Sequence, residues 1–333
     1  GSNNFRAGFA KRTNIDVMQY ALKIARLIRI EKVDCLYLNN DLVNNLSGMI
    51  AGQLMRVPVI QHERDIPAPI SRLATSLCSH AARVLAISTP VRQALEGMGY
   101  PGDRIRMVPE GLDLNLYHPA DPEALQKIRS QLGVAPRDKM AVLVGMVMDW
   151  KGQHVLIDAA PAVMARYPDM KFVIVGESPA GAESYAAGLK EQVMRLGLSG
   201  KILFSGYRSD IPAVMQTADI VVHASTSPEP FGRVVIEAMV MRTPVIATNI
   251  GAPPEIIRPG ETGYLVPPSD PAALAQAMLH ILDHPALAAE VGENAHREVL
   301  KKYSIQRHAA LIESVFEELF WGAPPVLASA LAV

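Results

Sequence analysis

Two glutamates with a glycine-containing turn between them are the residues of this sequence best suited to chemistry. Glu229 precedes and Glu237 follows the turn Pro230-Phe231-Gly232-Arg233, which opens an expected helix after the apolar run Ile220-His223. The first amides of a helix lack intrahelical partners, and the helix dipole places partial positive charge there. The turn is therefore suited to a diphosphate, and Gly232 lets such a ligand approach the backbone. The two carboxylates could accept hydrogen bonds from a sugar ring and a ribose, although each alone also has a purely structural interpretation.

The elements that must position these residues alternate between short apolar runs and amphipathic stretches. This alternation predicts βαβ units and an α/β fold of two doubly wound domains, each built on a parallel sheet. Ligands of such sheets bind at the carboxyl ends of the strands, so we expect the site in the cleft between two facing domains. Strands are expected at Asp34-Leu38, Val57-Gln61, Arg83-Ile87, Ile105-Val108, Met140-Gly145, Lys171-Gly176, Lys201-Gly206, Ile220-His223, Pro244-Thr248 and Tyr264-Val266. Helices are expected at about Ile15-Glu31, Asp41-Met55, Pro69-Cys78, Thr89-Met98, His154-Ala165, Ala182-Leu196, Asp210-Thr217, Gly232-Met241, Pro271-Asp283, Pro285-Lys302 and Ile305-Phe320.

The motif E-P-F-G-x4-E-A-M, from Glu229 to Met239, carries a family resemblance. It is followed by Pro244-Val245-Ile246-Ala247-Thr248 and then by Gly263-Tyr264-Leu265-Val266. In this order the residues resemble glycosyltransferase family 4, a family with the GT-B fold of two Rossmann-like domains. The family retains the anomeric configuration, needs no metal and has an E-x7-E signature. The resemblance implies that Glu237 binds the donor ribose and that Glu229 lies beside the transferred sugar.

Further matches extend the resemblance over most of the chain. The loop Trp150-Lys151-Gly152-Gln153 after Val144-Gly145 is similar to the family's loop in which a lysine neutralises the donor diphosphate, a role that suits Lys151. The loop after Gly206 implies that Tyr207 and Arg208 contact the nucleobase, although both also fit plain surface positions. The implied donor-binding residues are Gly145, Met146, Lys151, Tyr207, Arg208, Glu229, Pro230, Phe231, Gly232, Arg233 and Glu237.

Met146 is the main departure from the family, which usually has an arginine directly after this glycine to grip the phosphates. One charge-assisted contact, worth roughly 1.5–3 kcal/mol, is therefore absent or supplied elsewhere. Arg233, beside the expected helix N-terminus, is a candidate substitute. Glu110 is a second departure, since the family usually has an asparagine before the glycine at this point.

The first domain carries its candidates in the segment Gln61-His62-Glu63-Arg64-Asp65, directly after a strand. The resemblance implies that His62 contacts the donor sugar near the reacting carbon, although a polar loop histidine is an alternative. His62 thus joins Glu229 and Lys151 as a candidate catalytic residue. Glu63 and Arg64 are candidates for contact with the acceptor. Ser88 is expected to cap the helix that follows it.

The expected domain boundaries are 5–118 for the N-terminal domain, 119–137 for a linker and 138–303 for the C-terminal donor domain. The family fold implies that a last helix, 304–322, crosses back to the first domain, with Phe320 or Trp321 in contact with it. The first domain offers only four expected strands, and its opening residues carry no strand signal. We therefore expect it to be incomplete, lacking roughly 50 residues or more on the usual size of a βα unit.

The composition of the chain argues against a nucleic-acid-binding protein and against a membrane-spanning one. The chain has 32 Lys plus Arg and 33 Asp plus Glu, so it lacks the basic excess of a nucleic-acid binder. No signal peptide is evident, and no apolar run reaches the length of roughly 18 residues that a membrane span needs. Cys35 and Cys78 fall in apolar or helical stretches and are expected to be buried. We expect a cytoplasmic protein, with contact to the cytoplasmic face of a membrane left open.

The expected function is a retaining, metal-independent hexosyltransferase that uses a nucleoside-diphosphate sugar and a glycan, lipid-linked or small-molecule acceptor, in polysaccharide biosynthesis. The sugar nucleotide is a substrate, and no cofactor is expected. The base (UDP, GDP or ADP), the acceptor and the oligomeric state stay open. The alternative is a non-catalytic nucleotide-sugar-binding protein or an inactive fragment, which Met146 and the incomplete first domain favour. An epimerase or a phosphorylase of the same fold is a further alternative, but the sequence has no motif that separately indicates either.

Overall fold

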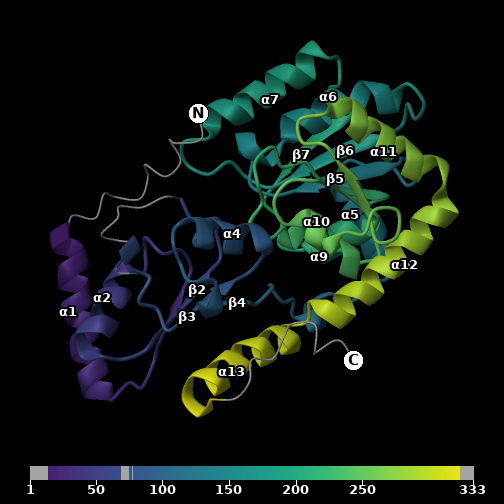
Figure 1. Ribbon diagram of the computed structural model, residues 1–333. Coiled ribbons are helices and arrows are strands. Elements are labelled where there is room, and N and C mark those ends of the chain that lie inside the picture. Colours follow the sequence, from purple (N-terminus) through teal and green to yellow (C-terminus); the bar gives the residue numbers. More distant parts are fainter. Residues whose placement is uncertain (1–13, 69–74, 77, 323–333) are drawn as a thin grey trace. The chain divides into compact units, whose positions relative to one another are not determined.

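The computed structural model describes residues 14–68, 75–76 and 78–322, and the chain divides into two units (Figure 1). The first unit combines the chain up to Glu110 with the chain from Gln306 on, and the second runs from Gly111 to Ile305. The segment 119–137, expected as a linker, instead belongs to the second unit. The physical reason is that Ile128 and Leu132 are buried in the core of that unit.

The first unit is built on a four-stranded parallel sheet with the order β1-β2-β3-β4. Its strands are β1 (Leu36–Asn39), β2 (Val59–Glu63), β3 (Arg83–Ala86) and β4 (Ile105–Met107). Its described helices are α1 (Asn14–Glu31), α2 (Leu46–Met55), α4 (Thr89–Gly97), a 3-10 turn (Gly102–Arg104) and α13 (Ile305–Trp321). The helix expected at Pro69-Cys78 falls largely outside the described residues.

Local polar contacts explain where the helices of this unit begin. α2 starts at Leu46 and not at Asp41, because residues 42–45 form a separate turn in which the Asn45 amide donates to the Leu42 carbonyl at 3.2 Å. Asp41 Oδ1 accepts the amide of Asn44 at 2.9 Å at the start of this turn. Ser88 caps α4 as expected, accepting the amide of Val91 at 3.4 Å. The two cysteines differ: Cys78 is buried, whereas the expectation of burial is wrong for Cys35, which is partly exposed just before the edge strand β1.

α13 completes the core of the first unit although its sequence follows the second unit. Leu311 and Val315 of this helix are buried together with Ile60, Leu85 and Val108. These three come from β2, from β3 and from the residue after β4. The helix therefore covers one face of the first sheet.

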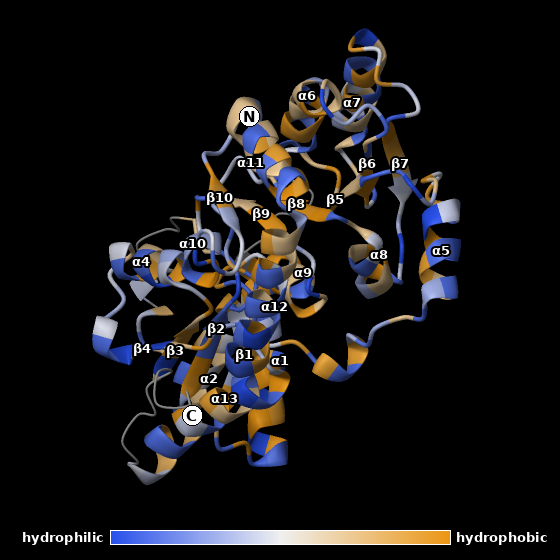
Figure 2. Ribbon diagram, turned by 90° about the vertical axis from the view of Figure 1, so that its right-hand side faces the viewer, coloured by the Kyte–Doolittle hydropathy of each residue, from blue (hydrophilic) through white to orange (hydrophobic). Residues whose placement is uncertain are grey.

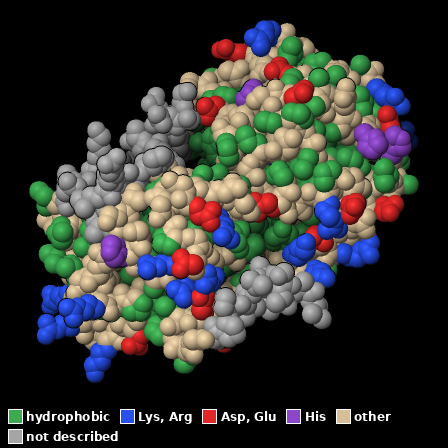
Figure 3. Space-filling model, viewed as in Figure 1, with side chains coloured by type: hydrophobic (Ala, Val, Ile, Leu, Met, Phe, Trp, Pro, Cys, Tyr) green, Lys and Arg blue, Asp and Glu red, His purple; other side chains and the backbone are tan. Residues whose placement is uncertain are grey.

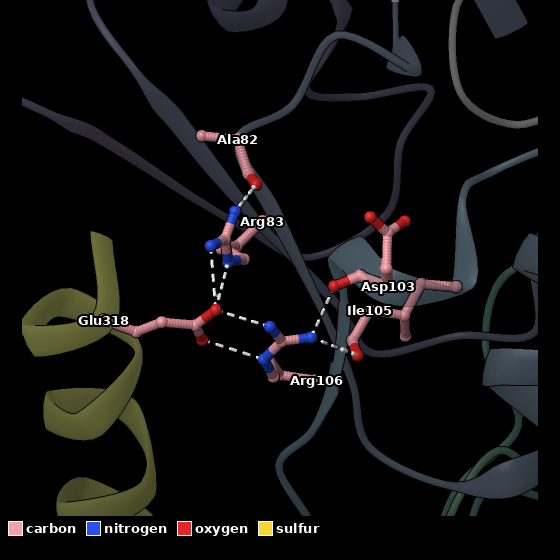
Figure 4. Close-up of polar contacts among 6 residues, drawn as sticks. All are labelled: Ala82, Arg83, Asp103, Ile105, Arg106 and Glu318. Carbon is pink, nitrogen blue, oxygen red and sulfur yellow. Dashed lines mark hydrogen bonds and ion pairs between the residues drawn. The ribbon is translucent and has the colours of Figure 1, made fainter. Parts of the chain in front are cut away.

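Polar contacts also join α13 to the edge of this sheet. Glu318 Oε1 accepts a hydrogen bond from Arg83 Nη2 at 2.8 Å, and Glu318 Oε2 accepts one from Arg106 Nε at 2.8 Å (Figure 4). Burial raises the pKa of Glu318, but the hydrogen bonds from both arginines outweigh it and lower the pKa. Of the aromatic residues expected at the interface, Trp321 is 76% exposed, and Phe320 stacks on Phe316 of the same helix.

The second unit is built on a six-stranded parallel sheet with the order β10-β9-β8-β5-β6-β7. Its strands are β5 (Met140–Val144), β6 (Lys171–Val175), β7 (Ile202–Gly206), β8 (Ile220–His223), β9 (Val245–Thr248) and β10 (Tyr264–Val266). Its helices are α5 (Pro122–Gln131), α6 (Gln153–Met164), α7 (Glu183–Arg195), α8 (Ile211–Thr217), α9 (Arg233–Val240), α10 (Pro253–Ile256), α11 (Pro271–Asp283) and α12 (Pro285–Lys302). Two 3-10 turns, Leu114–Leu116 and Asp149–Lys151, complete it.

Alternation along β5 and β6 explains the layers of this unit. Met140 and Val142 point to a core shared with α5 and α8, whereas Ala141 and Leu143 point to a core shared with α6, α7 and α11. Helices thus cover both faces, as parallel sheets require, and this is why the strands read as unbroken apolar runs. Figure 2 shows the hydrophobic strands of this sheet between helices with hydrophilic stretches.

The surface is mixed in charge. Figure 3 shows acidic and basic side chains interspersed over the viewed face, in keeping with a net charge of -1. Within the residues that the structure describes, no helix is both long and apolar enough to span a membrane.

Candidate functional site

The strand order of the second sheet reverses between β5 and β8, and two candidate residues follow these strands. β6 and β7 lie beyond β5, whereas β9 and β10 lie beyond β8. The loop after β5 carries Lys151, and the loop after β8 carries Glu229. In open α/β sheets, ligands bind outside the carboxyl ends of the strands at such a reversal. The topology therefore brings both residues to the place where a ligand is expected.

Lys151 and Glu229 form an ion pair, with Nζ 2.8 Å from Oε2. Ser225 Oγ donates to the same oxygen at 3.0 Å, and His223 Nε2 lies 3.1 Å from it. On its other side, Lys151 Nζ lies 4.0 Å from the centre of the Trp150 ring, within the range of a cation–π interaction. The ammonium is thus held between an aromatic face and a carboxylate.

The environment keeps Glu229 ionised. Burial raises its pKa, but the hydrogen bond from His223 and the charge of Lys151 outweigh burial and lower the pKa to about 2. At neutral pH the site therefore contains a lysine and a glutamate that are both charged. An anionic ligand that approaches Lys151 shares this lysine with Glu229.

Two glycines allow the loops around this ion pair to approach each other. A Cβ at Gly152, which has φ 72°, would lie 1.9 Å from the carbonyl oxygen of Ala224. A Cβ at Gly251, which has φ 78°, would lie 2.3 Å from the backbone nitrogen of Glu229. Because the obstructing atoms are backbone atoms, a larger residue at either position would displace the loop that carries the site.

The N-terminus of α9 lies next to Glu229 in sequence. Gly232, with φ 93°, precedes the helix, and its left-handed conformation suits glycine. Phe231 is buried edge-on against Tyr303, with ring centroids 5.9 Å apart, and Pro230 is partly exposed. The first amides of a helix have no acceptor one full turn before them in the helix, which makes such a turn suited to an anion. In this turn the amide of Val235 is engaged, since it donates to the Gly232 carbonyl at 2.9 Å.

Glu237, one turn into α9, is contacted by two residues. Arg233 Nε lies 3.6 Å from Glu237 Oε1, and the hydroxyl of Tyr117 donates to the same oxygen at 3.2 Å. Burial, followed by the nearby charge of Glu237, raises the pKa of Tyr117, so the phenol keeps its proton. Sequence patterns did not identify Tyr117, because it lies in an irregular segment far from the motif.

Gly145 and Met146 follow β5, at the start of the loop that leads to Lys151. The Met146 side chain is 49% exposed. Its backbone carbonyl accepts a hydrogen bond of 2.8 Å from Gln153 Nε2, and Gln153 is fully buried. The position that departs from the family is therefore fixed through its backbone, and its side chain adds no charge.

Tyr207 and Arg208 follow β7 and differ in their surroundings. Tyr207 is 72% exposed. Arg208 donates through Nε to Asp210 at 2.8 Å, so its guanidinium is already engaged. Asp210 and Tyr117 line an open groove of about 510 Å³, together with Leu116, His118, Ser209, Ile211, Pro212 and Ala213.

In the first unit, His62 is fully buried at the end of β2. Its Nδ1 lies 2.5 Å from the Tyr37 hydroxyl, and its ring stacks on His308 of α13 with centroids 5.7 Å apart. Its Nε2 is buried with no hydrogen-bond partner in the described part of the chain. Burial, followed by the charge of Arg64, lowers the pKa of His62 to about 3, so the ring is neutral at physiological pH.

The two residues that follow His62, Glu63 and Arg64, both contact other residues of the first unit. Glu63 is fully buried, and its Oε2 accepts the amide of Leu42 at 3.0 Å. Burial raises the pKa of Glu63 to about 8, so this side chain is mostly protonated at neutral pH. Arg64 Nη1 lies 3.6 Å from Glu110 Oε1. Contact of Glu63 or Arg64 with an acceptor stays a prediction.

Sequence reasoning also missed His223 and Ser225. Their signal was present, since alternate residues at the end of a strand point to the same side and lead directly into the glutamate motif. Across the residues described, no group of three or more His, Cys, Asp or Glu side chains is arranged to hold a metal ion.

Comparison with known proteins assigns the family. Residues 125–298 match the family of glycosyl transferases group 1, and residues 6–111 match a glycosyl transferase 4-like domain. The chain belongs to the group 1 glycosyl transferases. It is therefore a glycosyltransferase, and the resemblance found in the Glu229 motif is confirmed at the level of the family.

Relatives of this glycosyltransferase cover most of its length. A D-inositol 3-phosphate glycosyltransferase of Corynebacterium glutamicum is 31% identical over 81% of this chain and 69% of its own. A lipopolysaccharide core biosynthesis mannosyltransferase of Rhizobium leguminosarum is 34% identical over 64% of this chain and 59% of its own. The crystal structure of Anabaena HepE in complex with UDP is 31% identical, with a TM-score of 0.84 over 90% of this chain and 82% of that chain. The expected GT-B fold is confirmed.

Proposed function

We propose that this glycosyltransferase transfers a hexose from UDP-hexose to a hydroxyl of a carbohydrate or lipid-linked acceptor, with retention of configuration and without a metal. The observation that carries the proposal is the ion pair of Lys151 and Glu229 at the reversal of strand order, beside the N-terminus of α9. Uridine is favoured because HepE, 31% identical to this chain, binds UDP and UDP-glucose in its crystals. The acceptor class follows the relatives, which act on an inositol phosphate and on lipopolysaccharide core.

The proposed reaction breaks the bond between the anomeric carbon and a diphosphate oxygen. The acceptor oxygen forms its bond on the same face, and its proton passes to the departing phosphate oxygen. Negative charge grows on the diphosphate, so the catalyst needed is fixed positive potential. Lys151 and the first amides of α9 supply it, and this is why no metal is invoked. Glu229 accepts a hydrogen bond from the sugar, and Glu237 accepts one from the ribose.

His62 can donate a hydrogen bond to the sugar, as its predicted contact with the donor sugar requires. The Tyr37 hydroxyl keeps its proton, since burial raises the pKa of Tyr37 to about 12, and it faces His62 Nδ1. With Nδ1 accepting from Tyr37, the neutral ring carries its hydrogen on Nε2, which has no described partner. We assign this N–H as a donor to a sugar hydroxyl.

Calorimetric titration with UDP-, GDP- and ADP-hexoses tests the donor. We expect UDP-hexose to bind to the wild type and binding to weaken at least tenfold in Lys151→Met, the loss of one charged contact. The matched control is Lys190→Met, an exposed lysine of α7, which should bind as the wild type does. Equal binding by both variants would remove Lys151 from the proposal.

Transfer is then tested with inositol phosphates and with lipopolysaccharide core fragments. Proton NMR of the product reports the anomeric configuration, and inversion would contradict the proposed mechanism. Activity should survive EDTA, whereas a loss restored by a divalent cation would show that a metal takes part. Binding of UDP-hexose without transfer to any acceptor would favour the alternative of a non-catalytic binding protein.

A further inference from the structure

We propose that Ser225 and His223 are positioning residues that hold one carboxylate oxygen of Glu229 and leave the other for the transferred sugar. This inference rests on the proposed function of Glu229. His223 is the last residue of β8, and Ser225 begins the loop that leads to Glu229. All three side chains are thus supplied by one strand end, with Lys151 approaching from the neighbouring loop.

The two oxygens of Glu229 have different surroundings. Oε2 receives Lys151 Nζ at 2.8 Å, Ser225 Oγ at 3.0 Å and His223 Nε2 at 3.1 Å. Among the described residues these contacts all end on Oε2 and none on Oε1, and the glutamate side chain keeps 11% of its surface exposed. A carboxylate oxygen has about two lone-pair sites, which the three groups around Oε2 already share, while Oε1 can still accept. The carboxylate is fixed on one side and open on the other.

The environment of His223 defines which nitrogen carries its proton. Nε2 lies 3.1 Å from Glu229 Oε2, which can only accept, and 3.2 Å from Ser225 Oγ, which donates to that same oxygen and can accept in turn. A hydrogen on Nε2 therefore suits both neighbours. Nδ1 is buried without a partner among the described residues. A proton on Nδ1 would therefore be a buried donor without an acceptor, which costs more than an unused lone pair. The geometry thus assigns a hydrogen to Nε2 and a bare lone pair to Nδ1.

This arrangement matters when the donor binds. In the proposed function, Lys151 also donates hydrogen bonds to the diphosphate, and this weakens its ion pair with Glu229. Ser225 and His223 make no contact with the diphosphate in this scheme, so they keep Oε2 in place while the lysine is shared. Their loss should disorder the carboxylate at the reacting sugar and leave the diphosphate contacts intact. The effect is therefore expected on kcat more than on the KM for the donor.

Two variants of one residue provide a matched test. In His223→Gln the amide nitrogen can reach the position of Nε2, whereas in His223→Asn it reaches only the position of Nδ1. We expect His223→Asn and Ser225→Ala to lower kcat about tenfold each, with the donor KM changed less than about threefold. His223→Gln should recover most of the wild-type kcat. Equal losses in the Gln and Asn variants, or an unchanged kcat in Ser225→Ala and His223→Asn, would overturn the proposal.

Nitrogen-15 NMR of the histidine-labelled wild-type protein tests the same inference without any substrate. The His223 signals, assigned by their absence in His223→Gln, should show a protonated Nε2 and a bare Nδ1. The opposite tautomer would overturn the proposal even if the enzyme is active. Conversely, a wild type that transfers no sugar would count against the proposed function, while the tautomer would still decide the arrangement around Glu229.

Discussion

The hydroxyl of Tyr117 donates a hydrogen bond of 3.2 Å to Oε1 of Glu237, joining residues 120 positions apart. Tyr117 lies just after a 3-10 turn, in a segment without regular structure, and Glu237 lies in α9. The contact fixes the orientation of the carboxylate that is proposed to bind the ribose. It leaves Oε2 of Glu237 for a ribose hydroxyl.

Tyr117→Phe should therefore weaken donor binding. Loss of one hydrogen bond of about 1 kcal/mol corresponds to a roughly fivefold higher Kd for UDP-hexose. Calorimetry measures this Kd. Tyr264→Phe is the matched control, because the Tyr264 hydroxyl is buried without a partner in the described structure and its removal should leave the Kd unchanged. Tighter binding in Tyr117→Phe would mean that the tyrosine competes with the ribose.

Gly251→Ala should disrupt the site more than its backbone conformation alone explains. Gly251 and Gly260 share φ 78°, but a Cβ at Gly251 would lie 2.3 Å from Glu229 N, whereas at Gly260 it would meet nothing within 4 Å. Both alanine variants should lose about 1–2 kcal/mol of unfolding free energy from the left-handed conformation. Only Gly251→Ala should also lose at least tenfold in kcat. Urea unfolding and a transfer assay would separate the two, and equal behaviour would contradict the close approach.

The buried His62 should make stability fall in acid. Its pKa is lowered from 6.5 to about 3 on folding, so between these values the unfolded chain binds a proton that the folded chain does not. Its contribution is fully present above pH 6.5 and is lost as pH falls towards 3. The slope from this group approaches about 1.4 kcal/mol per pH unit. Urea unfolding from pH 8 to 5 should give a smaller slope for His62→Gln than for wild type or for the exposed-site control His118→Gln.

Glu318→Gln should loosen α13. The carboxylate accepts hydrogen bonds from two arginines, and removing its charge should cost about 2 kcal/mol. Hydrogen exchange of α13 should accelerate, and the difference from wild type should vanish as the carboxylate becomes protonated in acid. Glu317→Gln, at the exposed neighbouring position, is the control and should exchange as the wild type does. Unchanged exchange in Glu318→Gln would mean that apolar packing alone holds the helix.

The alternation of strands and helices could be predicted from the sequence, because parallel strands are apolar on both faces and helices are apolar on one. The start of α2 was not, since residues 42–45 form a separate turn in which the Asn45 amide donates to the Leu42 carbonyl. Helical periodicity does not reveal such a turn, because the turn depends on one local hydrogen bond.

The sequence predicted the residues of the candidate site better than it predicted the contacts between them. Lys151 and Glu229 were both identified from their loops, but their ion pair depends on β5 and β8 being neighbours in the sheet. That adjacency is a property of the topology, and no local pattern in one sequence encodes it. Likewise, Glu63 was a candidate for contact with the acceptor, and its hydrogen bond from the amide of Leu42, in another segment, was not predicted.

The split composition of the first unit bears on how the polypeptide is made. Leu311 and Val315, which complete its core, leave the ribosome only after all of the second unit has been synthesised. The second unit is continuous in sequence and can therefore fold first, during translation. Until α13 is made, the strands of the first unit expose one apolar face. Chaperones can bind this face, and it can aggregate. Premature termination before α13 would thus harm the half of the protein that was translated first.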